Sequence, residues 1–239
     1  PGTDSLNQGQ VGGFYRSNNN ARGGNFSASH AQENFRIGYD GSYSKADNYT
    51  AGGDFKTSKV TGRAGHTLPL DEVGSSAYEN INQTLSLAVQ NADHMAELKG
   101  GEQQVPEELF PNQRMDMTDN TQKWVNLRTR SHFNWGELEA GLYHEKVDHS
   151  MDFGPDKRFW YGTASGGPNG INGSGNGQPC SPIGPMCAAG MPMDSEGKTT
   201  GASLKASIDL SPMDVLRVGS EYQRYRLNDD WDPSGAMMW

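Results

Sequence analysis

Residues 122–152 read QKWVNLRTRSHF, NWG and ELEAGLYHEKVDHSMD, which predicts two β-strands joined by a tight turn. Side chains in a strand alternate between two faces. In the first arm, one face carries apolar or small residues: Val125, Leu127, Thr129, Ser131 and Phe133. The other face carries larger, mostly polar residues: Trp124, Asn126, Arg128, Arg130 and His132. In the second arm, apolar Leu138, Ala140 and Leu142 alternate with charged residues such as Glu137 and Glu139. Consecutive charges on one face suit a water-filled lumen, so the pattern indicates a wall of a transmembrane β-barrel.

The composition is compatible with this reading. The chain has 239 residues, of which 33% are hydrophobic, and its formal charge is −9. No window approaches the 18 or so apolar residues of a membrane helix, whereas a membrane strand needs only about 9–11 residues, half of them apolar. The 31 glycines favour a loop-rich all-β protein. The negative charge argues against nucleic acid as a partner and favours cations.

Three further hairpins are predicted along the chain, and their connections alternate between short and long. The short turns are AQEN (31–34), QNAD (90–93), NWG (134–136) and SPMD (211–214). Long polar connections are predicted after residue 46, over 102–121 and over 153–197. Outer-membrane barrels show this asymmetry, with short periplasmic turns and long extracellular loops. The prediction is an all-β antiparallel meander of about eight strands over 22–239, preceded by a poorly structured start or weak strand over 1–21. A soluble sandwich and a secreted β-solenoid are the alternative folds.

Several phrases also resemble a known family. They are FPNQRMDMTDN, GELEAGLYHEKVDHSMDFGPDKRFWYGT, AAGMPMDSEGKTTGASLKA and LRVGSEYQRYRLNDDW. This chain resembles the first half of the barrel of TonB-dependent outer-membrane receptors, most closely the branch of TonB-dependent copper receptors. The resemblance implies a bacterial outer-membrane location, contact with membrane lipid, and energy coupling through the TonB–ExbB–ExbD complex. We expect a barrel fragment, because neither the plug domain, the TonB box nor the remaining strands of the family are recognised in the chain.

The sequence contains no recognised enzymatic motif. GxSxG, HExxH, a P-loop and CxxC are all absent, and the Gly/Asn-rich run NGINGSGNG lacks the Lys of a phosphate-binding loop and the periodic Asp of a calcium repeat. We therefore predict no catalytic residue and no required cofactor, and we expect a receptor rather than an enzyme.

Sulfur and imidazole groups are the candidate ligands. Three short pairs have the i, i+2 spacing that places both side chains on one side of a strand: Met115 with Met117, His149 with Met151, and Met191 with Met193. Thioether and imidazole suit Cu(I), whereas hard ions prefer oxygen. His149 and Met151 are the first choice, because they continue the charged face of residues 137–145 towards the predicted extracellular mouth. The other four methionines are weaker candidates, since each could instead cover apolar surface.

Three functions remain open: uptake of a metal ion, with copper as the favoured cargo; uptake of a siderophore or other metal chelate; and a structural or adhesive barrel without transport. For chelate uptake, Arg158, Phe159 and Trp160 would supply loop contacts. Separately, Cys180 and Cys187 lie in a Gly/Pro-rich segment with six residues between them, which favours a loop-stapling disulfide over a metal pair and hence an extracytoplasmic compartment.

Overall fold

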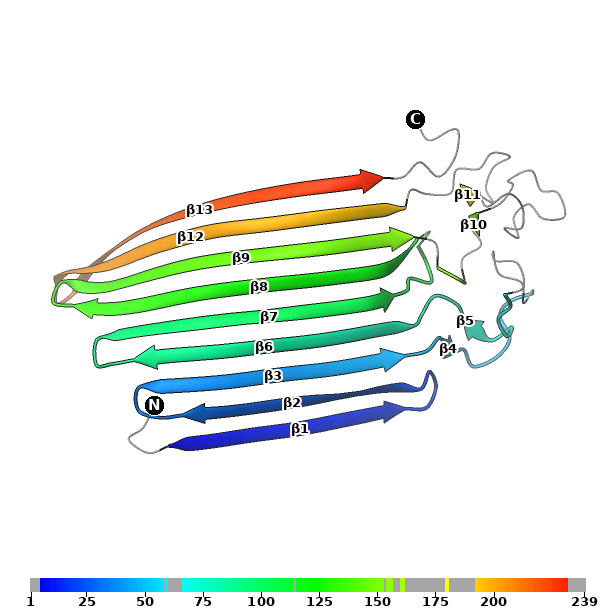
Figure 1. Ribbon diagram of the computed structural model, residues 1–239, viewed down its shortest axis with the longest axis horizontal. Helices are drawn as coiled ribbons and strands as arrows, with labels where there is room; N and C mark the ends of the chain where they lie inside the picture. Colours follow the sequence, from blue (N-terminus) through cyan, green and yellow to red (C-terminus); the bar gives the residue numbers. More distant parts are fainter. Residues whose placement is uncertain are drawn as a thin grey trace.

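The computed structural model describes residues 5–57, 59, 66–113, 115–152, 154–156, 160–161, 179–180 and 192–231. Within these ranges the chain forms one nine-stranded antiparallel sheet and no helix. The strands are β1 (Leu6–Arg16), β2 (Ala21–Ala31), β3 (Phe35–Ala46), β6 (Tyr78–Gln90), β7 (His94–Glu108), β8 (Asp116–Phe133), β9 (Gly136–Asp152), β12 (Met193–Ser211) and β13 (Asp214–Trp231). Their order in the sheet follows the sequence, so the all-β antiparallel meander is confirmed (Figure 1).

The turns of the predicted hairpins lie together at one end of the sheet. Residues 32–34, 91–93, 134–135 and 212–213 form this end, which we call the turn rim (Figure 1). At Gly136, which follows the β8–β9 turn, φ is +134°, a conformation open almost only to glycine. The predicted placement of the turns around 90–93, 134–136 and 211–214 on one rim is confirmed.

The opposite end, the loop rim, carries the other connections. They join β1 to β2, β3 to β6, β7 to β8 and β9 to β12, and their described residues at this end include 17–20, 47–57, 66–77, 109–113 and 154–156. Two small strand pairs lie there, β4 (Tyr49–Thr50) with β5 (Glu72–Val73) and β10 (Trp160–Tyr161) with β11 (Pro179–Cys180) (Figure 1). Cys180 is thus at the loop rim, whereas Cys187 lies outside the described residues, as do Arg158 and Phe159.

Two expectations about strand length differ from the structure. β1 spans Leu6–Arg16 in full register with β2, where a poorly structured start or a weak strand was expected; it is the ninth strand of the sheet, beside the eight from β2 to β13. The long loop expected over 102–121 is wrong, because β7 continues to Glu108 and β8 begins at Asp116. Polar and small residues occupy both faces of both segments, and the apolar residues of β1 are divided between its two faces, so the two-residue period cannot be seen in their sequences. Pro106 lies at an irregularity of the β6–β7 pairing, which is where a strand tolerates proline.

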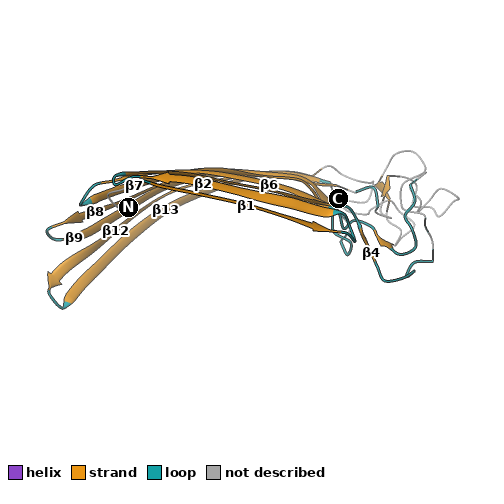
Figure 2. Cartoon of the chain, turned by 90° about the horizontal axis from the view of Figure 1, so that it is seen from below, coloured by secondary structure: helices purple, strands orange, loops and turns teal. Residues whose placement is uncertain are grey.

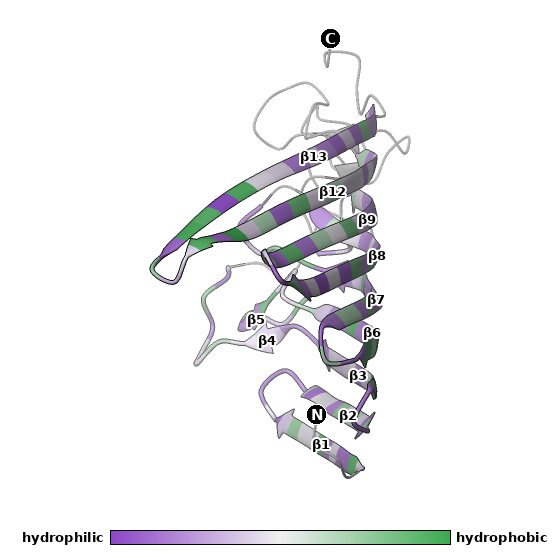
Figure 3. Cartoon of the chain, turned by 90° about the vertical axis from the view of Figure 1, so that its left-hand side faces the viewer, coloured by the Kyte–Doolittle hydropathy of each residue, from purple (hydrophilic) through white to green (hydrophobic). Residues whose placement is uncertain are grey.

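The sheet has one apolar and one polar face. Registered partners lie on the same face, and one such row runs through Leu98, Leu127 and Leu142. Leu142 is 56% exposed and Leu204, on the same face, 52% exposed, so this apolar face is not covered by the described part of the chain. The alternation of hydropathy along the strands is visible in Figure 3.

The sheet is a curved layer (Figure 2), with β1 and β13 as its two unpaired edges. Buried apolar residues of the strands gather near the loop rim rather than at the centre: Ala21, Ala46, Val105 and Met117. None of the described residues belongs to a helix long and apolar enough to cross a membrane. A curved sheet with an exposed apolar face fits the predicted sector of a barrel wall.

Candidate metal-binding wall at the loop rim

Three methionines from three adjacent strands form one row at the loop rim. Met151 on β9 is the registered partner of Met117 on β8 and of Met193 on β12. Side chains of directly opposed residues in an antiparallel pair start about 4.5–5.5 Å apart at Cβ. A flexible thioether side chain can span such a distance. We call Met117, Met151 and Met193 the methionine row.

A β-bulge brings Met117 into this row. The β8–β9 register shifts between Met117 and Asp119, so Thr118 has no partner on β9. Met117 and Asn120 are three positions apart, so in a strand without the shift their side chains would lie on opposite faces. Met117 would then lie on the apolar face. The extra residue reverses the alternation, and Met117 then shares the polar face with Asn120 and Met151. Its side chain is also the most enclosed of the row, with 8% of the residue exposed.

His149 lies beside the methionine row on the same face, two positions from Met151 on β9 and so about 7 Å along the strand. Its registered partners are Asn120 and Ser195. Nδ1 of His149 lies 3.1 Å from Oδ1 of Asn120, within hydrogen-bond distance. Because an amide oxygen only accepts, this bond places the proton on Nδ1 and leaves the lone pair of Nε2 available for a ligand. Asn120 therefore sets the tautomer in which the imidazole can bind a metal ion.

The six candidate sulfur and imidazole residues divide into three groups. Met117, Met151, Met193 and His149 come together on the polar face. Met115 lies in the bend before β8, outside the registered row, and Met191 is outside the described residues. The sequence spacing had suggested ligand pairs within one segment, whereas the structure also groups methionines across strands. Among the described residues, no three His, Cys, Asp or Glu side chains cluster as a metal site, so the soft donors are the candidate set.

A second polar cluster ties the loops together next to the methionine row, and Asp156 is its centre. Its carboxylate accepts hydrogen bonds from Asn48 Nδ2 at 2.8 Å and the Ser75 amide at 2.8 Å, and Nε2 of His66 lies 2.7 Å from it. Burial alone would raise the pKa of Asp156, but the hydrogen bonds from Ser75, Asn48 and His66 outweigh it and hold the pKa below its ordinary value. The carboxylate therefore stays ionised and joins segments far apart in sequence.

Asp116 continues this cluster down to the sheet. It is fully buried, accepts a hydrogen bond from the Phe110 amide at 2.8 Å, and is 3.2 Å from the Ser75 hydroxyl. Asp116 is also the residue next to Met117. The loops of residues 47–77, 109–115 and 153–156 are thus linked at the end of β8 where the methionine row begins. We call Asn48, His66, Ser75, Asp116 and Asp156 the loop cluster.

Nearer the turn rim, the polar face carries a group of alternating charges. Glu139 lies 3.5 Å from both Arg128 and Lys205, and 3.7 Å from Arg130. Tyr143, four residues further along β9, crosses Gly201 on the neighbouring strand and donates to Glu221 at 3.1 Å. These charges are mutually compensated and partly exposed, as expected for a wall facing water.

The fold is similar to that of solved outer-membrane transporters. A copper transporter, OprC, superposes with a TM-score of 0.60 at 17% identity, over 95% of this chain and 31% of that one. The FrpB iron transporter of Neisseria meningitidis gives 0.58 at 16% identity, over 94% of this chain and 29% of that one. No protein-family model and no curated protein sequence matches the chain.

By these coverages, the chain spans about a third of the length of the structures it resembles. These proteins belong to the TonB-dependent receptors that the sequence resembles. The resemblance predicted from the sequence is confirmed at the level of the fold. The nine strands have the fold of a sector of the β-barrel of a TonB-dependent outer-membrane receptor.

Proposed function

We propose that this chain is part of the barrel wall of a TonB-dependent outer-membrane receptor that takes up a metal ion, with copper as its cargo. The observation that carries the proposal is the meeting of His149 with the methionine row on the polar face at the loop rim. In a barrel, the polar face lines the lumen and the rim of long loops opens to the outside. The soft donors would then stand where a captured ion enters.

The donor chemistry favours copper over the other cargoes. Thioether sulfur and neutral imidazole bind Cu(I) well, whereas Mg²⁺ and Ca²⁺ select oxygen ligands. Wall residues on adjacent strands form an open arc, so further ligands would come from a plug domain inside the barrel. The proposal assigns no catalytic residue and no resident cofactor. Energy coupling through TonB–ExbB–ExbD and location in the bacterial outer membrane belong to the same proposal, supported by the fold.

A Met→Leu comparison tests the site. Leucine keeps the bulk and apolarity of methionine but lacks the sulfur, and such exchanges usually cost less than about 1.5 kcal/mol in packing. Met151→Leu removes the central thioether of the row. Met213→Leu, at the β12–β13 turn on the opposite rim, is the matched control, since Met213 is 94% exposed. We expect Cu(I) affinity of the purified receptor to fall at least tenfold in Met151→Leu and to stay at the wild-type value in Met213→Leu.

A second variant tests the role of the imidazole. Asn120→Ala removes the acceptor that sets the tautomer of His149 and should weaken Cu(I) binding by about 10–100-fold, the usual effect of losing a residue that orients a metal ligand. Equal Cu(I) affinity in wild type, Met151→Leu and Asn120→Ala would refute copper binding at this wall. Uptake of an iron chelate by all three proteins would then favour the chelate-receptor alternative.

A further inference from the structure

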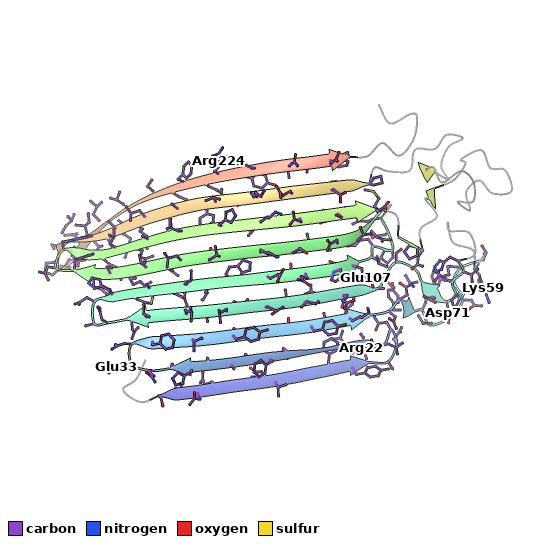
Figure 4. The ribbon with its side chains drawn as sticks, viewed as in Figure 1. Arg22, Glu33, Lys59, Asp71, Glu107 and Arg224 are labelled. Carbon is purple, nitrogen blue, oxygen red and sulfur yellow. The ribbon has the colours of Figure 1, made fainter. Side chains whose placement is uncertain are left out.

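A row of cations crosses four strands of the apolar face. Lys146 on β9 is the registered partner of Lys123 on β8 and of Lys198 on β12, and Lys198 is the partner of Arg226 on β13. Arg224 lies one level nearer the turn rim on the free edge strand (Figure 4). We call Lys123, Lys146, Lys198 and Arg226 the basic row.

The basic row marks the end of the apolar band. The apolar face between the turn rim and the row carries residues such as Leu127, Leu142 and Val218. From Gly136 to Lys146 the chain advances about 33 Å along the strand, which is about 25 Å of height at a strand tilt of about 40°. That is the height of the lipid-facing apolar band of an outer-membrane barrel. In the membrane position proposed above, the basic row thus lies at the headgroup level of the leaflet on the loop-rim side.

The order of charges along the strands matches a phosphate layer. The first carboxylates beyond the row on β9 and β12 are Asp148 and Glu196, one level nearer the loop rim. Lys146 contacts both, at 2.9 and 3.0 Å, and Lys198 contacts Glu196. If these ion pairs only stabilised the protein, the positions of the cations and the carboxylates could be exchanged, with the carboxylates next to the apolar band. On β9 and β12, however, the cation stands next to the lipid and the carboxylate stands outside it, whereas on β7 Glu102 lies at the level of the row as the partner of Lys123.

The basic side chains are also accessible from the lipid side. The side chain of Lys123 is 65% exposed although it contacts Glu102, its registered partner on β7, at 3.2 Å, and that of Lys146 keeps 37% exposed despite its two carboxylate contacts. Long lysine and arginine side chains extend along apolar surface and place their charges at a membrane interface. Four cations across three strand spacings cover about 14 Å, enough to meet more than one phosphate group.

We infer that the basic row is a binding surface for phosphate-bearing lipids of the outer leaflet. The inference rests on the membrane position of the chain proposed above, and it is independent of the cargo. Each cation near an anionic membrane surface strengthens attraction to it. The row would fix the height of this wall in the membrane and retain phosphorylated lipid beside β8–β13.

Charge-removing variants test the inference. The receptor with Lys123→Gln, Lys146→Gln and Lys198→Gln is compared with wild type in vesicles of phosphatidylcholine containing bisphosphorylated lipid A, and retained lipid A is counted by native mass spectrometry. We expect lipid A retention to fall about tenfold or more in this variant. The same lysines changed to Arg should retain lipid A, because the charges stay.

The control variant removes equal charge from the polar face: Lys99→Gln, Lys205→Gln and Arg217→Gln. It should retain lipid A as wild type does. Equal retention by wild type and the basic-row Gln variant, or an equal loss in the polar-face control, would overturn the inference while leaving the membrane barrel intact. Failure of wild type to insert into vesicles, seen as strands unprotected from protease, would instead refute the membrane position and the inference with it.

Discussion

Replacing Asp156 by Ala should release the loops at the loop rim without unfolding the sheet. The carboxylate accepts from the Ser75 amide and Asn48 Nδ2, both at 2.8 Å, and contacts His66 at 2.7 Å. Hydrogen bonds to a charged group contribute about 1.5–3 kcal/mol each. His66 is partly exposed, so its contact is discounted. The two full bonds give about 3–6 kcal/mol of local stability, to which the third contact adds little, and this stability is lost in Asp156→Ala.

Hydrogen–deuterium exchange measures this local stability. The amides of Ser75, Ser76 and Ala77 are held by Asp156 and Asn48, so a peptide covering them reports on the loop cluster. A loss of about 3–6 kcal/mol accelerates exchange by roughly 10²–10⁴-fold. Asp71→Ala is the matched control, because it removes a carboxylate of the same loop (Figure 4) that does not contact the cluster. Unchanged exchange in Asp156→Ala, or equal acceleration in Asp71→Ala, would show that the Asp156 carboxylate does not hold this segment in place.

The pH dependence of the loop cluster follows from the same contacts. The folded-state pKa of Asp156 is lowered, so its stabilising contribution is present above the ordinary carboxyl pKa of about 3.9 and is lost as pH falls through the lowered value. The exchange rate of the Ser75–Ala77 amides, divided by the intrinsic rate, should therefore show no dependence on the ionisation of Asp156 from about pH 5 upward. The same ratio should increase in stronger acid, where the carboxylate is protonated.

Two further variants probe the sheet itself. Gly136→Ala should lower the free energy of unfolding in urea by about 2–3 kcal/mol, because φ is +134° and the new Cβ would lie 2.0 Å from the Ser207 carbonyl oxygen. Gly52→Ala is the control and should be neutral, since no atom lies within 4 Å of its Cβ. Equal urea midpoints for the two variants would contradict a strained turn at Gly136. Leu142→Arg, on the apolar face, should cost about 2–4 kcal/mol in vesicles near the bilayer midplane, whereas Asn126→Arg on the polar face should cost little; the reverse order would mean that the faces are assigned wrongly.

The two-residue alternation of side chains decides which strands can be predicted from the sequence. The hairpin of residues 122–152 alternates between Leu or Ala and charged side chains, so its strands, faces and turn follow from a two-residue period. β1 and the loop-rim end of β7 were missed because Gln, Gly, Asn and Glu occupy both of their faces. Their strand structure depends on backbone pairing with β2 and β8, which side-chain polarity does not reveal.

The meander, the turn rim, the two faces and the shared side of His149 and Met151 follow from the sequence, because they depend on neighbours along one strand. The grouping of Met117 and Met193 with Met151 comes from the three-dimensional arrangement. Their alignment depends on the register of separate strands and on the bulge at Thr118, which turns Met117 to the polar face. The three-dimensional arrangement also decides the loop cluster, since Asp156 meets Asn48 across 108 residues of chain. Contacts of that separation follow from where the strands end in space, and no local pattern encodes them.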